Sequence, residues 1–186
     1  MAAEAAIVMA GGRAERLHGR VKPLLHICRG RRLIDWSLET AGALAGRVYV
    51  AVPPGLAGLP WRLPPWAALV ATPGRGYPVD VEAAARAVAA RPLLVLPADL
   101  YGLTPRSLEP LIAEGLLSGG VVTGACRGSP LGVSLIAGRS WSPWRTAELR
   151  GCRALINVNT PRDLRRAVED CTRRGATGAG PGRGST

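Results

Sequence analysis

Lysine is almost absent from this sequence: Lys22 is the single one, although Lys and Arg together number 24. Phe is missing altogether while Ala and Arg are abundant, which we interpret as a compositional bias without functional meaning. The four cysteines, at positions 28, 126, 152 and 171, form no CxxC pair, so neither a zinc site nor a disulfide framework is indicated. We therefore expect reduced thiols, as in the cytosol.

Long hydrophobic runs and a basic leader are also lacking. The amino terminus, MAAEAAIVMAGG, has no positively charged region before its apolar stretch. That stretch is far shorter than the roughly 20 residues that span a bilayer. We predict neither a signal peptide nor a membrane span, and hence a cytoplasmic protein.

Acidic residues are scarce, 13 against 24 basic ones, which gives a net charge of +11. Such a charge suits a polyanionic partner, which could be nucleic acid, an acidic membrane surface or the phosphates of a nucleotide. The arginines are scattered, with no long basic run, no aromatic and basic RNA motif and no zinc-finger spacing. Nucleic acid is therefore disfavoured, and a non-catalytic nucleotide- or RNA-binding module remains as an alternative function.

The length of 186 residues favours one domain. We assign residues 1–174 to it and expect the Gly-rich segment 175–186 to be a flexible tail. Short apolar segments typical of buried strands recur at residues 5–10, 47–52, 67–72, 92–98, 120–125, 132–137 and 154–158. Turn-rich segments at 53–65, 72–78 and 138–145 are predicted to be loops.

Segments with helical periodicity separate several of these strands. The apolar residues that share a helix face are Ile34, Leu38 and Ala41 in 33–44; Val81, Ala84, Ala85 and Val88 in 81–90; and Leu164, Ala167, Val168 and Cys171 in 161–173. Alternation of strands and helices predicts an α/β fold: a three-layer, Rossmann-like, mainly parallel sheet with helices on both faces.

A pair of glycines, Gly11 and Gly12, follows the first predicted strand directly. Glycines there let the backbone turn sharply and present bare N–H groups to an anion, although a tight turn alone would have the same sequence. The pattern is neither GxGxxG nor GxxxxGK[ST]. Four cations follow within ten residues and would attract a triphosphate: Arg13, Arg16, Arg20 and Lys22.

Two further polar segments follow predicted strands. Asp99 ends the run LLVLPADL, where a carboxylate can hold Mg²⁺ or, alternatively, form an Asx-turn. In INVNTPRDL, Thr160 and Asp163 read as a capping box around a helix start, which leaves Asn157 and Asn159 without a structural explanation.

The segment AGGRAERLHGRVKPLL, residues 10–25, resembles the AGGxGxR…KPL signature of the nucleotidyltransferase superfamily, with Ala14 where that signature has its next glycine after Gly12. The resemblance implies a nucleotide-diphospho-sugar transferase type of fold, catalysis by Arg16, Lys22 and Asp99, and a metal site at Asp99 and Asn159. It also implies a nucleotide site at Ala10, Gly11, Gly12, Arg13, Arg16, Lys22, Gly74, Arg75, Gly76, Asp99 and Gly132.

Within this MobA-like superfamily, the chain is similar to the archaeal GTP:adenosylcobinamide-phosphate guanylyltransferases. The similar segments are residues 22–36, 72–84, 96–100, 129–138 and 155–164, in the same order. The rival, a molybdenum-cofactor guanylyl- or cytidylyltransferase, would carry a PGxGPLAGL-like segment where this chain has PGRGYPVDV. By this resemblance, Tyr77 and Asp80 lie near the nucleotide or corrinoid pocket.

The reaction that the resemblance implies transfers GMP from GTP to adenosylcobinamide phosphate and releases pyrophosphate, a step of cobalamin assembly. Its cofactor would be Mg²⁺, and its partners GTP, adenosylcobinamide phosphate and, in a homodimer, a second copy of the chain. The acceptor is already an anion, so positioning and charge neutralisation can carry catalysis without a Ser-His-Asp set.

Overall fold

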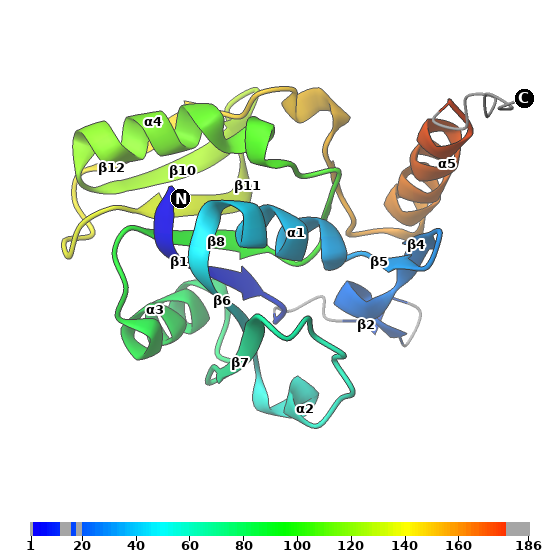
Figure 1. The fold of residues 1–186 in the computed structure, drawn as a ribbon, viewed down its shortest axis with the longest axis horizontal. Helices are drawn as coiled ribbons and strands as arrows, with labels where there is room; N and C mark the ends of the chain where they lie inside the picture. Colours follow the sequence, from blue (N-terminus) through cyan, green and yellow to red (C-terminus); the bar gives the residue numbers. More distant parts are fainter. Residues whose placement is uncertain (1, 12–15, 18–19, 178–186) are drawn as a thin grey trace, which may run out of the picture.

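A computed structural model describes residues 2–11, 16–17 and 20–177 (Figure 1). Its centre is a seven-stranded sheet in the order β12-β10-β11-β8-β1-β6-β7. All neighbours are parallel except the two pairs that include β11. The strands are β1 (Ala3–Met9), β6 (Ala45–Val52), β7 (Ala67–Ala71), β8 (Leu93–Pro97), β10 (Val121–Cys126), β11 (Ser129–Ile136) and β12 (Trp144–Glu148).

Helices cover both faces of the sheet, as predicted (Figure 1). α1 (Asp35–Leu44) and α4 (Glu109–Ser118) pack on one face, and α3 (Tyr77–Val88) packs on the other. α2 (Pro54–Ala57) is a single turn, and α5 (Pro161–Thr177) packs beside the β4 strand. No helix in the described ranges is both long and apolar enough to cross a bilayer.

Short elements connect the main ones. The strand pairs are β2 (Arg16–Leu17) with β3 (Arg20–Val21), β4 (His26–Cys28) with β5 (Arg31–Arg32), and β9 (Leu100–Tyr101) with β13 (Ile156–Asn157). The short 3₁₀ helices are η1 (Lys22–Leu24), η2 (Pro105–Leu108) and η3 (Cys152–Ala154).

The predicted strands and helix faces match the structure, with differences at several boundaries. α3 begins at Tyr77, inside the predicted loop 72–78. The segment 154–158 is not a strand of the main sheet, because only two of its residues pair, and they pair with β9. The predicted loop 138–145 is too long, because β12 begins inside it at Trp144, which pairs with Val121 of β10. α4 was not predicted, since its apolar residues surround the helix without a distinct polar face. α5 continues to Thr177, and the rest of the expected tail lies outside the described residues.

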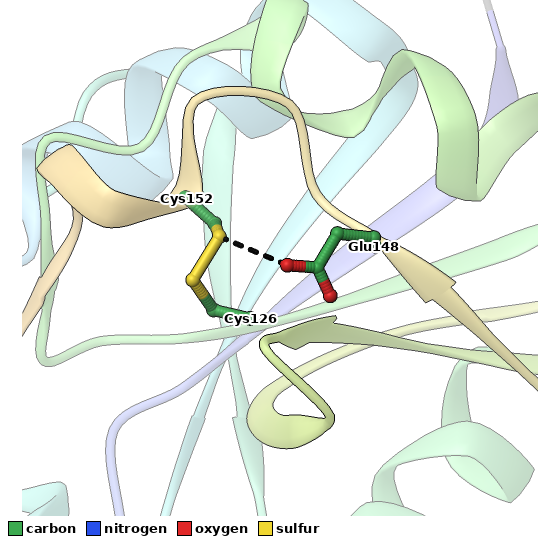
Figure 2. A group of neighbouring side chains, drawn as sticks. All are labelled: Cys126, Glu148 and Cys152. Carbon is green, nitrogen blue, oxygen red and sulfur yellow. Dashed lines mark hydrogen bonds between the residues drawn. A yellow bond between two sulfur atoms is a disulfide. The ribbon is translucent and has the colours of Figure 1, made fainter.

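The expectation of reduced cysteines is wrong for this structure, in which all four are paired. Cys28 joins Cys171 and Cys126 joins Cys152, with Cα separations of 6.1 and 5.5 Å. The sequence spacing concealed these pairs because tertiary contacts bring together residues 143 and 26 positions apart. Figure 2 shows Glu148 beside the second disulfide, 3.4 Å from Cys152 Sγ; both sulfurs are bonded to each other and are therefore not thiolate ligands.

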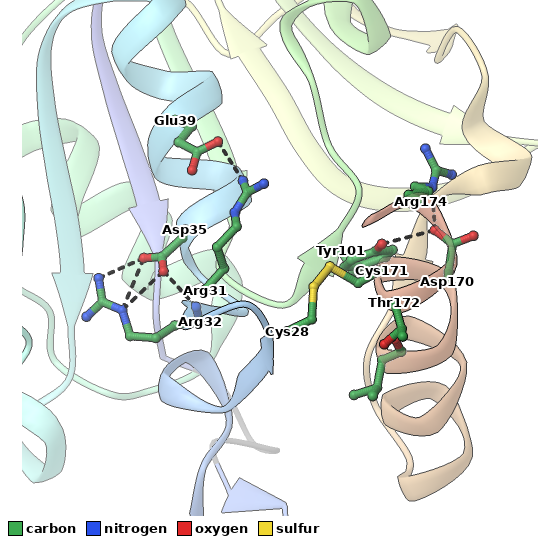
Figure 3. The surroundings of a disulfide bond; sticks show 11 residues. Cys28, Arg31, Arg32, Asp35, Glu39, Tyr101, Asp170, Cys171, Thr172 and Arg174 are labelled. Atoms are coloured by element: carbon green, nitrogen blue, oxygen red, sulfur yellow. Dashed lines mark hydrogen bonds and ion pairs between the residues drawn. A yellow bond between two sulfur atoms is a disulfide. The ribbon is translucent and has the colours of Figure 1, made fainter. Parts of the chain in front are cut away.

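The first disulfide fixes α5 against the β4–β5 segment (Figure 3). Tyr101 lies in the same small core, and its hydroxyl donates to Asp170 Oδ2 on α5 at 3.0 Å. Burial raises the pKa of Tyr101 to about 12, and the hydrogen bond and negative charge of Asp170 contribute to the increase. The middle of α5 is thus held by a covalent bond, apolar packing and the hydrogen bond from Tyr101 of β9.

Candidate active site

The carboxyl ends of β1 and β8 lie side by side at the centre of the sheet, as the strand order requires. Their register continues past the strands, because the Ala98 N–H donates to the Met9 carbonyl at 3.0 Å. Gly11 and Asp99 therefore leave the sheet from adjacent strands. In open parallel sheets, this is the edge at which ligands bind.

Lys22 reaches this edge from η1 and joins it to the start of α5. Its Nζ lies 2.5 Å from Asp99 Oδ2 and 3.0 Å from Asn159 Oδ1. The three residues are separated by 77 and 137 positions in the sequence. The structure thus brings together the lone lysine, the predicted metal aspartate and the predicted metal asparagine, which we call the Lys22 cluster.

The Lys22 cluster is partly removed from water. The lysine side chain is 6% exposed and that of Asp99 is 23% exposed. A buried ammonium needs opposite charge and hydrogen-bond acceptors, because losing its hydration is costly. Asp99 and Asn159 supply both. The Ile34 N–H donates to the Pro23 carbonyl at 3.0 Å, and this hydrogen bond fixes η1.

The backbone around Asp99 is secured from two sides. Ser37 is fully buried on α1, and its hydroxyl donates to the Pro97 carbonyl at 2.7 Å. On the other side, the Val158 N–H donates to the Asp99 carbonyl at 2.9 Å, so the segment leading to Asn159 is bonded to the segment that follows β8. These contacts keep the Asp99 and Asn159 side chains on the same lysine.

The capping box at α5 has the predicted geometry and orients Asn159. The Asp163 N–H donates to Thr160 Oγ1 at 3.2 Å, and Asp163 Oδ2 accepts from the Thr160 N–H at 2.9 Å. The same carboxylate oxygen accepts from the Asn159 N–H at 3.2 Å. Asn157 remains unusual, because its buried Oδ1 has no hydrogen-bond partner among the described residues.

The pKa of Asp163 is shifted downward by this capping box. Desolvation opposes the shift, but the hydrogen bonds from Thr160 and Asn159 outweigh it. A carboxylate with a lowered folded-state pKa stabilises the fold above its ordinary pKa of 3.8, and the benefit is lost as the pH falls through the lowered value.

We expect Asp163→Asn to lower the free energy of unfolding by about 0.5–1 kcal/mol at pH 7, because the cap loses its charge at the helix amino terminus. Urea unfolding at pH 7 and at a series of pH values down to 3 measures this. The difference in unfolding free energy between the parent and Asp163→Asn should become smaller below pH 3.8. A difference that grows below that pH would contradict the stabilising role of the Asp163 carboxylate.

The loop after β7 is held by a buried carboxylate. Asp80 on α3 is 3% exposed, and its Oδ1 accepts from the N–H groups of Gly74 and Arg75 at 2.8 and 3.2 Å. Gly76, the residue before α3, has a φ of 107° that only glycine adopts readily. The predicted nucleotide loop is thus a shaped turn at the amino terminus of a helix, where anions are favoured.

Pro53, just after β6, connects this turn to the first loop. A Cβ built on Gly74 would lie 3.2 Å from the Pro53 ring, and one built on Gly11 would overlap the same ring. The sequence predicts that Pro53 lies in a loop and indicates no role for it, since a Pro-Pro pair does not show which residues pack on its rings. Both glycines are required for close packing here.

Gly132 closes the other side of the site. It has a φ of 73° and lies in a bulge of β11, where the register shifts opposite Gly124 and Ala125. The Tyr77 hydroxyl donates to the Gly132 carbonyl at 2.7 Å, which links the start of α3 to this bulge. Burial of the hydroxyl raises the pKa of Tyr77, and the negative charge of Asp99 raises it further, although 37% of the residue is exposed.

Part of the predicted site cannot be placed. Gly12 and Arg13 lie outside the described residues, and for Arg16 the structure describes only the backbone, which pairs with Val21 in the β2–β3 hairpin. Arg16 is therefore in the hairpin that leads directly into Lys22. Ala10 is buried, and its N–H donates to the Ala51 carbonyl at 2.9 Å.

The Lys22 cluster offers a suitable donor set for a divalent cation. Asp99 Oδ2 and Asn159 Oδ1 contact one positively charged atom, and the unpartnered Asn157 Oδ1 lies two residues from Asn159. Carboxylate and amide oxygens are the ligands that Mg²⁺ and Mn²⁺ prefer. These residues could hold such an ion once Lys22 turns toward a phosphate.

We expect Asp80→Ala to raise the KM for the nucleoside triphosphate about tenfold with a smaller change in kcat. The reason is that the Gly74 and Arg75 N–H groups lose their acceptor and the loop loses its shape, a cost of about 1.4 kcal/mol in binding. Steady-state kinetics measure this split, and Asp80→Asn, which retains an acceptor oxygen, should recover most of the loss. Equal KM values for the parent and Asp80→Ala would refute the role of the loop.

A model of the family described as the MobA-like NTP transferase domain matches residues 6–173. The bifunctional protein GlmU of Thermotoga maritima is 38% identical over 47 residues, which span 25% of this chain but only 11% of that curated relative. The molybdopterin-guanine dinucleotide biosynthesis protein A of Archaeoglobus fulgidus has a similar structure, with a TM-score of 0.69 and 21% identity over 90% of this chain and 98% of that one. A manganese complex of a Mycobacterium tuberculosis protein gives a TM-score of 0.62 at 16% identity, over 89% of this chain and 97% of that one.

The similarity to these solved structures shows that the chain shares their fold. Because the family model covers most of its length, the chain belongs to the MobA-like NTP transferase family. Enzymes of this kind commonly use divalent metal ions.

Proposed function

We propose that this protein transfers GMP from GTP to the phosphate of adenosylcobinamide phosphate and releases pyrophosphate. The observation that carries the transferase part of the proposal is the convergence of Lys22, Asp99 and Asn159 at the end of β8. The choice of acceptor rests on the five segments that resemble the archaeal guanylyltransferases, and on the absence of the PGxGPLAGL-like segment of the molybdenum-cofactor enzymes.

In this mechanism an oxygen of the acceptor phosphate attacks the α-phosphorus of GTP. The bond from that phosphorus to the bridging oxygen of the β-phosphate breaks, and pyrophosphate leaves with its electron pair. The acceptor needs no general base, because a phosphate monoester already carries about −1.5 to −2 charge near neutral pH. The difficulty is to bring two anions together, so the enzyme must neutralise charge and align the attack.

Each part of the site has one task in that step. The triphosphate binds to the first loop, which comprises Ala10, Gly11, Gly12 and Arg13. Its negative charge is neutralised by Arg16 and Lys22. Gly74, Arg75 and Gly76 bind the nucleoside side, and Gly132 leaves room at the reacting end. Mg²⁺ held by Asp99 and Asn159 would supply positive charge to the phosphate oxygens.

The test is a matrix of pyrophosphate release with Mg²⁺. The four nucleoside triphosphates are each combined with adenosylcobinamide phosphate, molybdopterin or mannose 1-phosphate. We expect turnover with GTP and adenosylcobinamide phosphate above every other pair. If pyrophosphate is released only with molybdopterin, the proposed acceptor is wrong and molybdopterin takes its place. If no combination releases pyrophosphate, the enzymatic proposal is wrong, and a non-catalytic nucleotide-binding module is favoured.

A further inference from the structure

One face of the sheet is only half covered. α3 packs over β1 and β7, whereas the opposite face is covered by α1 and by α4 on β10, β11 and β12. Beyond α3, the strands β8, β11 and β10 line a groove. Val95, Val121 and Ile136 lie at its floor and are almost fully buried, because they pack in the same apolar cluster as the side chains of α3.

The groove beside α3 has a volume of about 560 Å³. This volume is within the range of roughly 300–1,000 Å³ that is usual for small-molecule sites. Tyr77 and Pro78 at the start of α3 line it, as do Trp141 and Trp144 near the start of β12. Trp144 is 63% exposed, which leaves its ring free to contact a ligand.

The groove has little charge, although the chain carries a net charge of +11. Glu82 is the charged residue that lines it, and its carboxylate is paired with Arg86 at 2.6 Å. Two of the polar groups on the floor satisfy each other, since Thr123 Oγ1 and Ser134 Oγ lie 3.2 Å apart. The groove therefore favours an uncharged, apolar group over a phosphate or a sugar.

One end of the groove meets the active site. Tyr77 lines the groove and also donates to the Gly132 carbonyl, and the nearest atoms to a Cβ on Gly132 would be those of Pro97, two residues before Asp99. A molecule that places its phosphate beside the Lys22 cluster can thus extend its remaining part along the groove. The aromatic walls offer flat faces on which a ring system can stack.

We propose that this groove binds the body of the acceptor, and that the acceptor is a phosphate ester carrying a large ring system. This inference rests on the proposed function and deepens it, because a corrin macrocycle belongs to that class whereas a sugar phosphate does not. Trp144 is then a specificity-determining residue for the acceptor and contributes nothing to nucleotide binding.

The test compares Trp144→Ala and Thr146→Arg with the parent in pyrophosphate release. Both residues line the groove. Trp144→Ala removes an aromatic side chain from it, and Thr146→Arg places a large charged side chain in it. We expect the KM for adenosylcobinamide phosphate to rise about tenfold or more, which corresponds to about 1.4 kcal/mol of lost contact, while the KM for GTP stays within about twofold. Trp66→Ala is the matched control, because Trp66 is 50% exposed but packs on Gly42 at another part of the surface.

Unchanged acceptor KM values in both groove variants would overturn the inference and leave the proposed function standing. If the parent releases no pyrophosphate with this acceptor, the proposed function fails, and the groove is then tested alone by quenching of Trp fluorescence with cobinamide in the absence of nucleotide. Quenching that is lost in Trp144→Ala supports the groove, and no quenching in the parent overturns it. A dimer that dissociates in Trp144→Ala during sedimentation, with acceptor KM unchanged, would assign the groove to a second copy and also overturn the inference.

Discussion

Replacing Asp99 with Asn should lower Mg²⁺-dependent pyrophosphate release by about 10³-fold, equivalent to about 4 kcal/mol of transition-state stabilisation. The change keeps the size of the side chain but removes the negative charge that pairs with Lys22 at 2.5 Å and that would hold a metal ion. Initial rates at saturating GTP and acceptor measure the loss, and circular dichroism checks that the fold is unchanged.

Asp35→Asn is the matched control for this prediction. Asp35 also forms a partly buried ion pair, with Arg32 at 2.7 Å and with its side chain 20% exposed, but it lies at the start of α1. We expect Asp35→Asn to retain activity within about threefold, because its pair stabilises only a local turn. Full activity of Asp99→Asn would contradict the assignment of a metal-binding role to Asp99.

Replacing Lys22 with Arg should lower kcat/KM by about 100-fold, and replacing it with Met by about 10³-fold. A compact ammonium fits between Asp99 Oδ2 and Asn159 Oδ1, whereas a planar guanidinium in a position that is 5% exposed would have to displace one of them. Steady-state kinetics with GTP as the varied substrate measure both variants.

A double-mutant cycle separates the catalytic part of this effect from stability. Lys22→Met leaves Asp99 without its partner and should lower the free energy of unfolding by about 1–3 kcal/mol, whereas adding Asp99→Asn should recover part of that loss. Activity should not recover in the double variant. If Lys22→Arg turns over GTP as fast as the parent, the solitary lysine reflects compositional bias alone.

The sequence suggests polar residues at Asp99 and Asn159, and the family resemblance assigns both, with Lys22, to one site. Asp99 follows an uninterrupted apolar run, and Asn159 precedes a capping box whose hydrogen bonds have the predicted pattern. Carboxyl ends of neighbouring strands in a parallel sheet lie at one edge, which brings Gly11 and Asp99 together. Asn159 reaches the same edge through the pairing of β13 with β9 and the hydrogen bond from Val158 to Asp99. The direct contact of Lys22 with Asp99 was not predicted, because the resemblance assigned the lysine to the triphosphate.

The parts that were not predicted depend on contacts between distant elements. The disulfide Cys28–Cys171 requires α5 to pack on β4, which no spacing of cysteines reveals. The packing of Gly11 and Gly74 on Pro53, and the hydrogen bond from Tyr77 to Gly132, likewise join segments whose sequences indicate only turns. β12 was missed because its strand begins inside a Ser- and Pro-containing segment that is typical of a loop.

The central claim is that the Lys22 cluster is where the triphosphate and its metal ion bind. Because the chain contains one lysine, protein labelled with ¹⁵N at the lysine side chain gives one ammonium resonance, which reports on Nζ of Lys22 alone. Titration with Mg²⁺ and GTP should shift that resonance, with saturation at one equivalent, and the shift should be absent in Asp99→Asn. A resonance that stays in place while the protein becomes saturated with GTP would contradict the account.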